Sequence, residues 1–478
     1  MSHLSYKLGR KGQLNLPGIT HASKKTVEDL LLKDAEIHHC FFNSAGFHNH
    51  LSHHLLAAYD LGASPGHLQK MYDDEARYQR PIVSQDKEKE NVVDDNNWVQ
   101  YLGNSSAYNA FVKFFANKVQ TLGVTGTLEK YVFEEEANAD HVLMLNRVVS
   151  GAIHPFILLG YGAEFGNDTL IVTGLAQAAV HRAGTVLTSK SYVEPSQSVN
   201  LFELLREVYD SEALKPALPY DPNAFINARI QRVVENGGAE EIRRLCAKYS
   251  ISRDITDSEL AQKTEEVIWV STLLTFATGR KGRKPRLDFF LMHILTSSLF
   301  LRPWLSVLKK PEHKAELLRV YIPVLILTML SRGRPRIDPE YIMSFTDVPR
   351  PPLDKSLFPK PIKTSLGSPT NDEDYDPWPA LIEGVQYHQD AHVLKALRTL
   401  IYGAQHFGIT PPGEVPGTFR SSNNKEETHI GMAKVDGTVF VRAAGLLMNT
   451  LGWAGYGQEE GEWDRSALGW NAAWEGKD

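Results

Sequence analysis

The stretch Asp288–Leu301 reads DFFLMHILTSSLFL, and only its first residue is charged. Its apolar residues fall on every side of a helix, a pattern typical of helices buried in a protein core. The run is shorter than the roughly 20 apolar residues that a membrane-spanning helix needs. We therefore predict a buried core helix here, and a second one at Tyr321–Leu330, where charges again close off an apolar run.

Apolar residues three or four positions apart, the spacing of a helix, recur along much of the chain. The segments that have this spacing are Trp98–Gly123, Leu201–Tyr209, Glu240–Tyr249, Ser258–Thr278, Ala315–Leu330 and Pro379–His406. Strand signals are scarce. The clearest is His429–Val441, where Asp436-Gly437 separates two β-rich runs in the manner of a two-residue hairpin turn. The sequence predicts a mainly α protein, a helical bundle-like single unit with a small β-hairpin region near the C-terminus.

Residues 350–379 are the best candidate for a linker. They are rich in Pro, Ser and Asp and contain Pro-Lys-Pro and Ser-Pro steps that interrupt helices. Only about 100 residues follow them, which is short for a further domain with its own core. We therefore interpret 350–379 as a Pro-rich internal loop and expect residues 1–478 to form one domain.

Composition excludes several classes of partner. The chain has 478 residues and a net charge of −6, so a broad positive surface for nucleic acid is not expected. Its two cysteines, Cys40 and Cys246, are too few for a disulfide framework and fit a reducing compartment. The N-terminal stretch lacks the apolar core of a signal peptide. We expect a cytoplasmic protein without nucleic-acid or membrane partners, and its oligomeric state is left open.

The familiar cofactor motifs are missing from the sequence. Gly160-Tyr161-Gly162 and Gly455-Tyr456-Gly457 lack the spacing of a dinucleotide-binding loop, and neither follows a clear strand. The sequence contains no Walker loop, GxSxG elbow, HExxH or CxxC. If the protein performs redox chemistry, its sequence shows no flavin or nicotinamide site of the usual kind for it.

Histidine is the unusual feature of the composition, with 18 residues. The segment Phe47–Leu61 reads FHNHLSHHLLAAYDL and contains His48, His50, His53 and His54. So many imidazoles in one segment are typical of metal or proton chemistry.

Other histidines lie in apolar surroundings. His154 precedes Pro155, which suits the first turn of a helix, and His293 lies inside the apolar stretch quoted above. An isolated buried histidine is more often a hydrogen-bonded core residue than a metal ligand. The spacing alone also gives no reason to prefer His181 or His429.

The segment Pro379–His406 predicts an amphipathic helix with His388, His392 and Lys395 on one face, at positions i, i+4 and i+7. Lysine is rarely buried because its ammonium group loses hydration, which lowers its pKa. A neutral lysine amine can react with carbon dioxide to give a carbamate, an anionic oxygen ligand for a metal. The other interpretation is that Lys395 extends along the helix to the surface and pairs with a carboxylate.

A second set of residues follows the order of a known iron-binding motif. His388-Gln389-Asp390, His429 and Arg442 follow the HxD…H…R order of oxoglutarate-dependent iron oxygenases. Within a helix, however, residues i and i+2 point about 200° apart and cannot share a metal. We therefore rank this interpretation below the others.

The chain resembles the questin oxidase-like family, fungal enzymes of aromatic polyketide pathways. The motifs that carry the resemblance are FHNHLSHHLLAAYDLGASP (Phe47–Pro65), WVQYLGNSSAYNAFVKFF (Trp98–Phe115), HPFILLGYGAEFG (His154–Gly166), GLAQAAVH (Gly174–His181), KPRLDFFLMHILTSSLFL (Lys284–Leu301) and DAHVLKALRTLIYG (Asp390–Gly403). Each motif is modestly specific, whereas their shared order along the whole chain is strongly so.

The resemblance implies an activity. Family members open the central ring of anthraquinones, in fungal secondary metabolism, and are often described as Baeyer–Villiger oxidases. One branch resembles non-haem iron dioxygenases, with Fe(II) held by four histidines and a carboxylated lysine and with dioxygen as co-substrate. Because the dinucleotide motif is missing, we favour this second description, with a small planar aromatic substrate, an anthraquinone or its reduced form.

The family motifs also imply a ligand set. Matched residue by residue, they give His50, His154, His293, His392 and Lys395 as metal ligands, with His388 and His54 in reserve. Tyr161, Glu164 and His181 are expected to orient the substrate, beside Lys395 in the catalytic set. Two alternatives stay open: an NADPH- or flavin-dependent Baeyer–Villiger-type monooxygenase on the same substrate class, and a helical binding protein without catalytic activity.

Overall fold

The computed structural model describes residues 6–82, 92–139, 141–185, 187, 195, 197–216, 219–354, 356 and 358–476. Helices account for most of the regular structure in these residues, so the prediction of a mainly α fold is confirmed. The described residues fall into two compact units. The first comprises Met1–Gln197, Gly237–Thr264 and Thr296–Leu327, and the second comprises Ser198–Asn236, Glu265–Leu295 and Thr328–Asp478.

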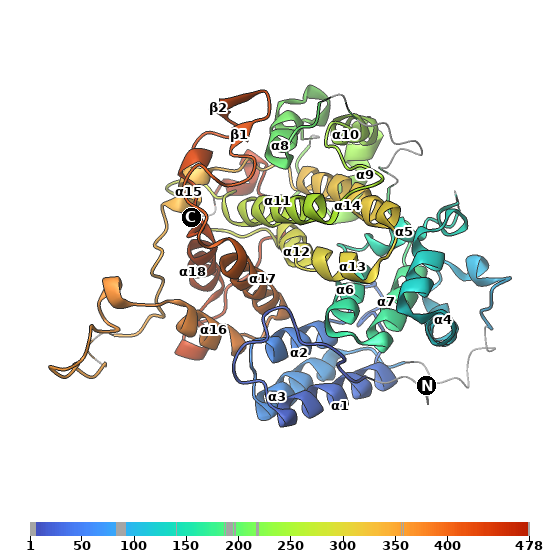
Figure 1. Ribbon diagram of the computed structural model, residues 1–478, viewed down its shortest axis with the longest axis horizontal. Helices are drawn as coiled ribbons and strands as arrows, with labels where there is room; N and C mark the ends of the chain where they lie inside the picture. The colour runs from blue at the N-terminus through green and yellow to red at the C-terminus, as the bar shows by residue number, and fades with distance from the viewer. Residues whose placement is uncertain are drawn as a thin grey trace. The chain divides into compact units, whose positions relative to one another are not determined.

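Figure 1 labels the helices in chain order. The first unit contains α1 (His21–Ile37), α2 (Leu51–Asp60), α3 (Pro65–Glu75), α4 (Tyr108–Leu128), α5 (Met144–Val148), α6 (His154–Phe165), α7 (Asp168–Val180), α10 (Gly238–Cys246) and α13 (Leu301–Val307). The second contains α8 (Leu201–Asp210), α9 (Ile226–Glu235), α15 (Pro339–Met343), α16 (Trp378–Gln386), α17 (Ala391–Phe407) and α18 (Val439–Leu451). Helices α11 (Asp257–Phe276), α12 (Phe289–Ser298) and α14 (Pro311–Ser331) contribute residues to both units.

The core of the first unit is built around α6 and α7, which run side by side next to α4 (Figure 1). Every residue of α6 is buried, and so is every residue of α7 after Asp168, as expected for helices that are apolar on all sides. Glycine allows their close packing, since a Cβ on Gly160 would lie 2.4 Å from the Cβ of Phe300. The indole of Trp304 on α13 donates a hydrogen bond to the Phe156 carbonyl at 3.0 Å and joins α13 to α6.

The apolar stretch Asp288–Leu301 forms α12, and its last residue begins α13. The window Phe289–Val307 is long and apolar enough to cross a membrane, yet 78% of it is buried inside the protein. Tyr321–Leu330 lies within α14 and is also mostly buried. Both runs therefore supply core helices, as predicted.

In the second unit, α17 and α18 pack against each other (Figure 1). The predicted continuous helix Pro379–His406 is wrong, because α16 ends at Gln386 and α17 begins at Ala391. Asp390 causes the break by capping α17: its carboxylate accepts the backbone N–H of His392 at 2.9 Å. His388 consequently lies between two helices and does not share a helix face with His392 and Lys395.

The small hairpin exists, but not where we predicted it. Strands β1 (Phe419–Arg420) and β2 (Asn423–Glu427) pair antiparallel. The predicted turn at Asp436-Gly437 instead leads into α18. The carboxylate of Asp436 accepts the backbone N–H of Thr438 at 2.8 Å, so this aspartate prepares a helix start in place of a β-turn.

The Pro-rich segment 350–379 belongs to the second unit. Its described residues before α16 contain one short helical turn, Asp372–Asp374. Arg350 stabilises the segment, because its guanidinium donates to the Pro369 carbonyl at 2.7 Å and lies 3.6 Å from the ring centre of Tyr375. That residues 1–478 act as one catalytic domain stays a prediction.

Candidate metal centre

A pair of histidines lies in the first unit, where α2 and α6 begin. His50 directly precedes α2, and His154 is the first residue of α6. Their Nε2 atoms are 2.8 Å apart. The Nδ1–H of His154 donates to the Gly151 carbonyl at 2.6 Å, so the neutral ring keeps a lone pair on Nε2. Two ring nitrogens that face each other in this way suit a shared cation.

An unusual backbone turn creates this geometry. Gly151, Ala152 and Ile153 have φ angles of +57°, +51° and +65°. The left-handed region is costly for a β-branched residue such as Ile153, and such costs concentrate at functional sites. The turn brings the Gly151 carbonyl back to the ring of His154, and a Cβ on Gly151 would lie 2.4 Å from the His181 ring.

Two further imidazoles pack against His154. The His48 ring stacks on it, with ring centres 3.8 Å apart and planes within 8°. His48 is in turn hydrogen-bonded to His181, with 2.6 Å between the two Nε2 atoms. Burial, together with the nearby charge of Arg147, lowers the pKa of His181 to about 4, so this ring is neutral near pH 7.

A second pair of histidines lies in the second unit. The Nδ1–H of His293 donates to the Phe289 carbonyl at 2.8 Å, and the Nδ1–H of His392 donates to Asp390 Oδ1 at 2.7 Å. Both rings therefore present Nε2 as the nitrogen that can bind a metal. Their centres are 5.1 Å apart. The Asp390–His392 contact is the carboxylate–histidine arrangement that orients many metal-binding imidazoles.

Phe289 packs against both members of this second pair. Its ring centre lies 4.7 Å from that of His293 and 4.9 Å from that of His392, in edge-on contacts. The guanidinium of Arg465 lies 4.1 Å from the centre of the Phe289 ring. The aromatic ring and its cation thus limit the rotation of both imidazoles.

Lys395 follows His392 by one turn on α17, and only 2% of it is exposed. The interpretation that it extends to the surface is therefore wrong. Its charge contributes, after burial, to holding the pKa of the neighbouring His392 below the ordinary value. A cation here is costly, whereas conversion to a carbamate would give an anion beside two imidazoles that suit a divalent metal.

The reserve histidines have other partners. His388 uses both ring nitrogens, one toward the Leu451 carbonyl at 2.9 Å and one toward the Asp390 backbone N–H at 3.1 Å. The Nδ1 of buried His54 makes a short hydrogen bond to Glu75. His388 and His54 are therefore not members of either histidine pair.

The residues expected to orient a substrate are all in the first unit and buried or nearly so. His181 lies next to His48, as described above. The Tyr161 ring packs 5.2 Å from that of His53 and 4.5 Å from that of Phe300. Glu164 accepts the backbone N–H of Gln13 at 2.7 Å and so anchors the N-terminal segment. Their roles toward a substrate stay predictions.

In the HxD constellation, Asp390 is occupied as a helix cap and as the hydrogen-bond acceptor of His392. His429 packs edge-on against Phe202 and Tyr209. Arg442 donates to Asp347 at 3.0 Å. Asp390 thus orients a neighbouring imidazole, a role the sequence reasoning missed, although an Asp two residues before a His at a helix start was a usable signal.

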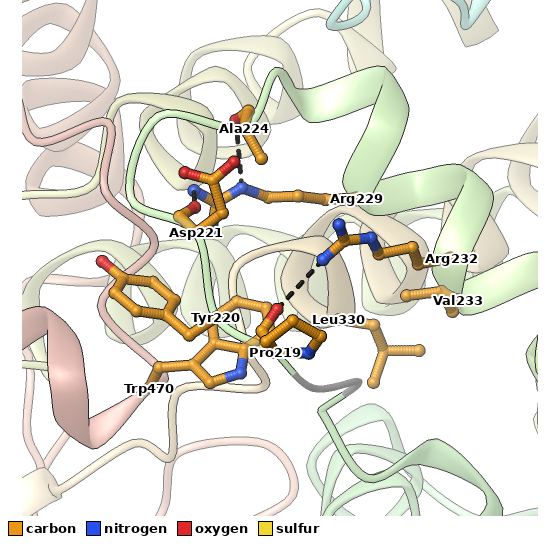
Figure 2. Close-up of a pocket in the computed structure, with 9 residues that line it drawn as sticks. All are labelled: Pro219, Tyr220, Asp221, Ala224, Arg229, Arg232, Val233, Leu330 and Trp470. Atoms are coloured by element: carbon orange, nitrogen blue, oxygen red, sulfur yellow. Dashed lines mark hydrogen bonds between the residues drawn. The ribbon is translucent and has the colours of Figure 1, made fainter.

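A surface pocket in the second unit is not part of either histidine pair. Figure 2 shows Tyr220 and Trp470 on one side and the guanidinium groups of Arg229 and Arg232 on the other. Arg229 donates to several backbone carbonyls, among them that of Asp221 at 2.6 Å. The pocket is thus lined by an arginine already engaged in holding the chain together.

A family model described as questin oxidase-like matches residues 47–400, which span both histidine pairs and Lys395. The chain belongs to the questin oxidase-like family. It is 28% identical over 392 residues to the questin oxidase of Aspergillus fumigatus, with 79% of this chain and 80% of the relative covered. It is 29% identical over 431 residues to the Baeyer-Villiger monooxygenase dmxR6 of Cryptosporiopsis, with 86% and 88% covered.

The Baeyer-Villiger oxidase AgnL3 of Paecilomyces divaricatus is 32% identical over 298 residues, covering 60% of this chain and 63% of the relative. These relatives are named as oxidases and monooxygenases. Membership therefore makes this chain an oxidoreductase.

Proposed function

We propose that the protein is an oxygenase that opens the central ring of an anthraquinone-type aromatic polyketide by dioxygen-dependent cleavage of a carbon–carbon bond, at a non-haem iron. In this proposal His50, His154, His293 and His392 bind one Fe(II) ion, and carboxylated Lys395 is the fifth ligand. The four histidines form a group that could hold a metal ion.

The observation that carries the proposal is how the imidazoles are held. In His154, His293 and His392 the Nδ1–H is engaged by a carbonyl or carboxylate oxygen. The same nitrogen, Nε2, is thereby presented in all three rings. Ligands oriented in this way are characteristic of metal centres, because the second interaction fixes both tautomer and direction.

Lys395 would complete the charge of the site. Its neutral amine nitrogen would attack the carbon of carbon dioxide and release a proton, which gives a carbamate with one negative charge. Four neutral imidazoles and one anionic oxygen suit Fe(II). When bound, the iron would supply the activation of dioxygen that an aromatic ring cleavage requires.

The other residues of the chain would keep this site dry and oriented. Asp390 holds the Nδ1 proton of His392 and the start of α17. The buried apolar faces of α6 and α12 exclude water. His181, neutral at pH 7 because its pKa is about 4, could accept a hydrogen bond from a phenolic hydroxyl of the substrate.

A second candidate is a Baeyer–Villiger-type monooxygenase that uses NADPH. The names of several relatives, which are called Baeyer-Villiger oxidases or monooxygenases, favour it. It predicts oxygen insertion beside the ring carbonyl and a requirement for a nicotinamide reductant. The lack of a dinucleotide-binding motif in the sequence speaks for the iron proposal instead.

Elemental analysis of protein purified without chelators or metal-binding tags tests the proposal. We expect about one iron per chain, and consumption of dioxygen with a dihydroxyanthraquinone in the absence of NADPH. Protein that binds no iron after anaerobic Fe(II) addition, and that turns over only with NADPH, would replace it by the second candidate.

A further inference from the structure

The segment before the first metal-ligand candidate folds back on itself. The Asn49 N–H donates to the Cys40 carbonyl at 2.9 Å and the Phe42 N–H to the Phe47 carbonyl at 2.8 Å. Phe41 and His48 form a bridge between these two contacts. Residues 40–49 thus form a small hairpin loop that ends next to His50.

Three aromatic rings gather at the tip of this loop. Phe42 stacks with Phe47 at 6.0 Å and meets Tyr78 edge-on at 5.7 Å. Phe47 is 51% and Tyr78 54% exposed. Phe42 is half-buried, and the tip residues 44–46 are Ser, Ala and Gly, which have small side chains. A contiguous group of exposed rings is more typical of a binding surface than single exposed apolar residues are.

Other residues of the same loop contact the histidines of the candidate metal centre. Buried Phe41 lies 5.5 Å from His48 and 5.3 Å from His181, in edge-on contacts. His48 in turn stacks on His154 at 3.8 Å. All these residues belong to the first unit, so the loop that carries the exposed rings packs through its buried residues Phe41 and His48 against His154.

A positive charge lies near the base of the loop. The Arg80 carbonyl accepts the backbone N–H of His39 at 2.9 Å, and the charge of the Arg80 guanidinium acts on the side chains of His39 and Cys40. The faces of the aromatic rings suit a planar ring system, and a positive charge at the base of the same loop suits one that carries phenolic oxygens.

We propose that the rings of Phe42, Phe47 and Tyr78 capture a planar, phenolic polycyclic substrate on its way to the metal centre. This inference rests on the proposed function for the destination of the substrate. The ligand proposed for the exposed rings is a small molecule. The test distinguishes this from self-association of the protein through the same rings.

The test uses Phe47→Ala, Tyr78→Ala and the double variant in the full-length protein. Binding of the dihydroxyanthraquinone chrysazin is followed by quenching of tryptophan fluorescence, with iron content, thermal midpoint and sedimentation measured alongside. We expect each substitution to weaken binding by between about 2- and 10-fold, with KM rising and kcat kept. Phe47→Tyr should keep wild-type affinity because it retains the ring.

Phe225→Ala is the matched control, since Phe225 is 77% exposed but lies in the second unit. It should leave binding unchanged. Chrysazin affinity that is equal in the double variant and the wild type would overturn the proposal. So would a loss of iron in the variants, or a shift of sedimentation that reveals a dimer contact. Because the binding assay needs no turnover, weaker chrysazin binding in an iron-free protein would refute the proposed function and keep the capture surface.

Discussion

The two histidine pairs are held by different means. In the first unit, the Nδ1 proton of His154 is received by a backbone carbonyl, and a neighbouring imidazole stacks on the ring. In the second unit, a carboxylate receives the Nδ1 proton of His392, and a buried lysine follows one turn later.

Backbone strain thus positions the first pair, whereas side-chain charge is the main feature of the second. The left-handed turn at Gly151–Ile153 places the first pair by its backbone conformation. In the second pair the Asp390 carboxylate orients His392, and Lys395 follows on the same helix, so the charge of the proposed centre is concentrated there. Substitutions of charged side chains should therefore weaken metal binding most when they are made in the second unit.

The largest effect is expected from Lys395→Ala. Loss of the proposed anionic ligand should lower iron content and turnover by at least about 100-fold, more than the loss of an outer partner does. Elemental analysis and dioxygen uptake measure this, and circular dichroism checks that the helices remain. Lys434→Ala, at a surface ion pair, is the matched control. Turnover retained in the Lys395 variant would refute the carbamate. In wild-type protein, ¹³C-labelled bicarbonate should give a carbamate signal that the variant lacks.

His293→Ala should also remove most of the iron, because a buried imidazole with an oriented Nε2 is lost. His388→Ala is the matched comparison, since both nitrogens of His388 already bond to backbone groups. That variant should lose stability but keep its iron. Iron per chain and the thermal midpoint are measured for both variants. If His388→Ala lost its iron and His293→Ala kept it, His388 would replace His293 as a ligand.

Asp390→Asn tests the carboxylate in the second pair. An amide oxygen can still accept the His392 proton, but the negative charge is lost. We expect a 10- to 100-fold lower affinity for Co(II), a probe followed by its visible absorption. Asp436→Asn removes a comparable charge before α18 and should not change the affinity. Equal affinities in both variants would mean that the Asp390 charge has no role in metal binding.

The smallest effect on the metal is expected from Glu75→Ala. It leaves Nδ1 of buried His54 without its acceptor, at a cost of about 1–3 kcal/mol in the free energy of unfolding. Iron content should stay unchanged, since His54 is outside both pairs. Urea denaturation measures the loss, with exposed Asp73→Ala as control. A variant of normal stability with less iron would make His54 a ligand.

Local sequence patterns predicted α4, α8, α10, α11 and α14, as well as the burial of α12. They failed where one side chain redirected the backbone. The helical spacing in Pro379–His406 gave no sign of the break before α17, because an Asp inside a periodic segment reads equally well as a surface residue. Asp436-Gly437 failed similarly, since its carboxylate bonds to Thr438 and prepares a helix.

The sequence by itself determined that the chain is helical, that imidazoles and a lysine lie on apolar segments, and which family it resembles. Those properties depend on residue type and short-range spacing. Only the tertiary structure decided that His154 meets His50 and that His388 turns to the Leu451 carbonyl. These contacts join residues far apart in the chain, so they follow from packing and from backbone turns such as the one at Gly151–Ile153, which short-range patterns do not encode.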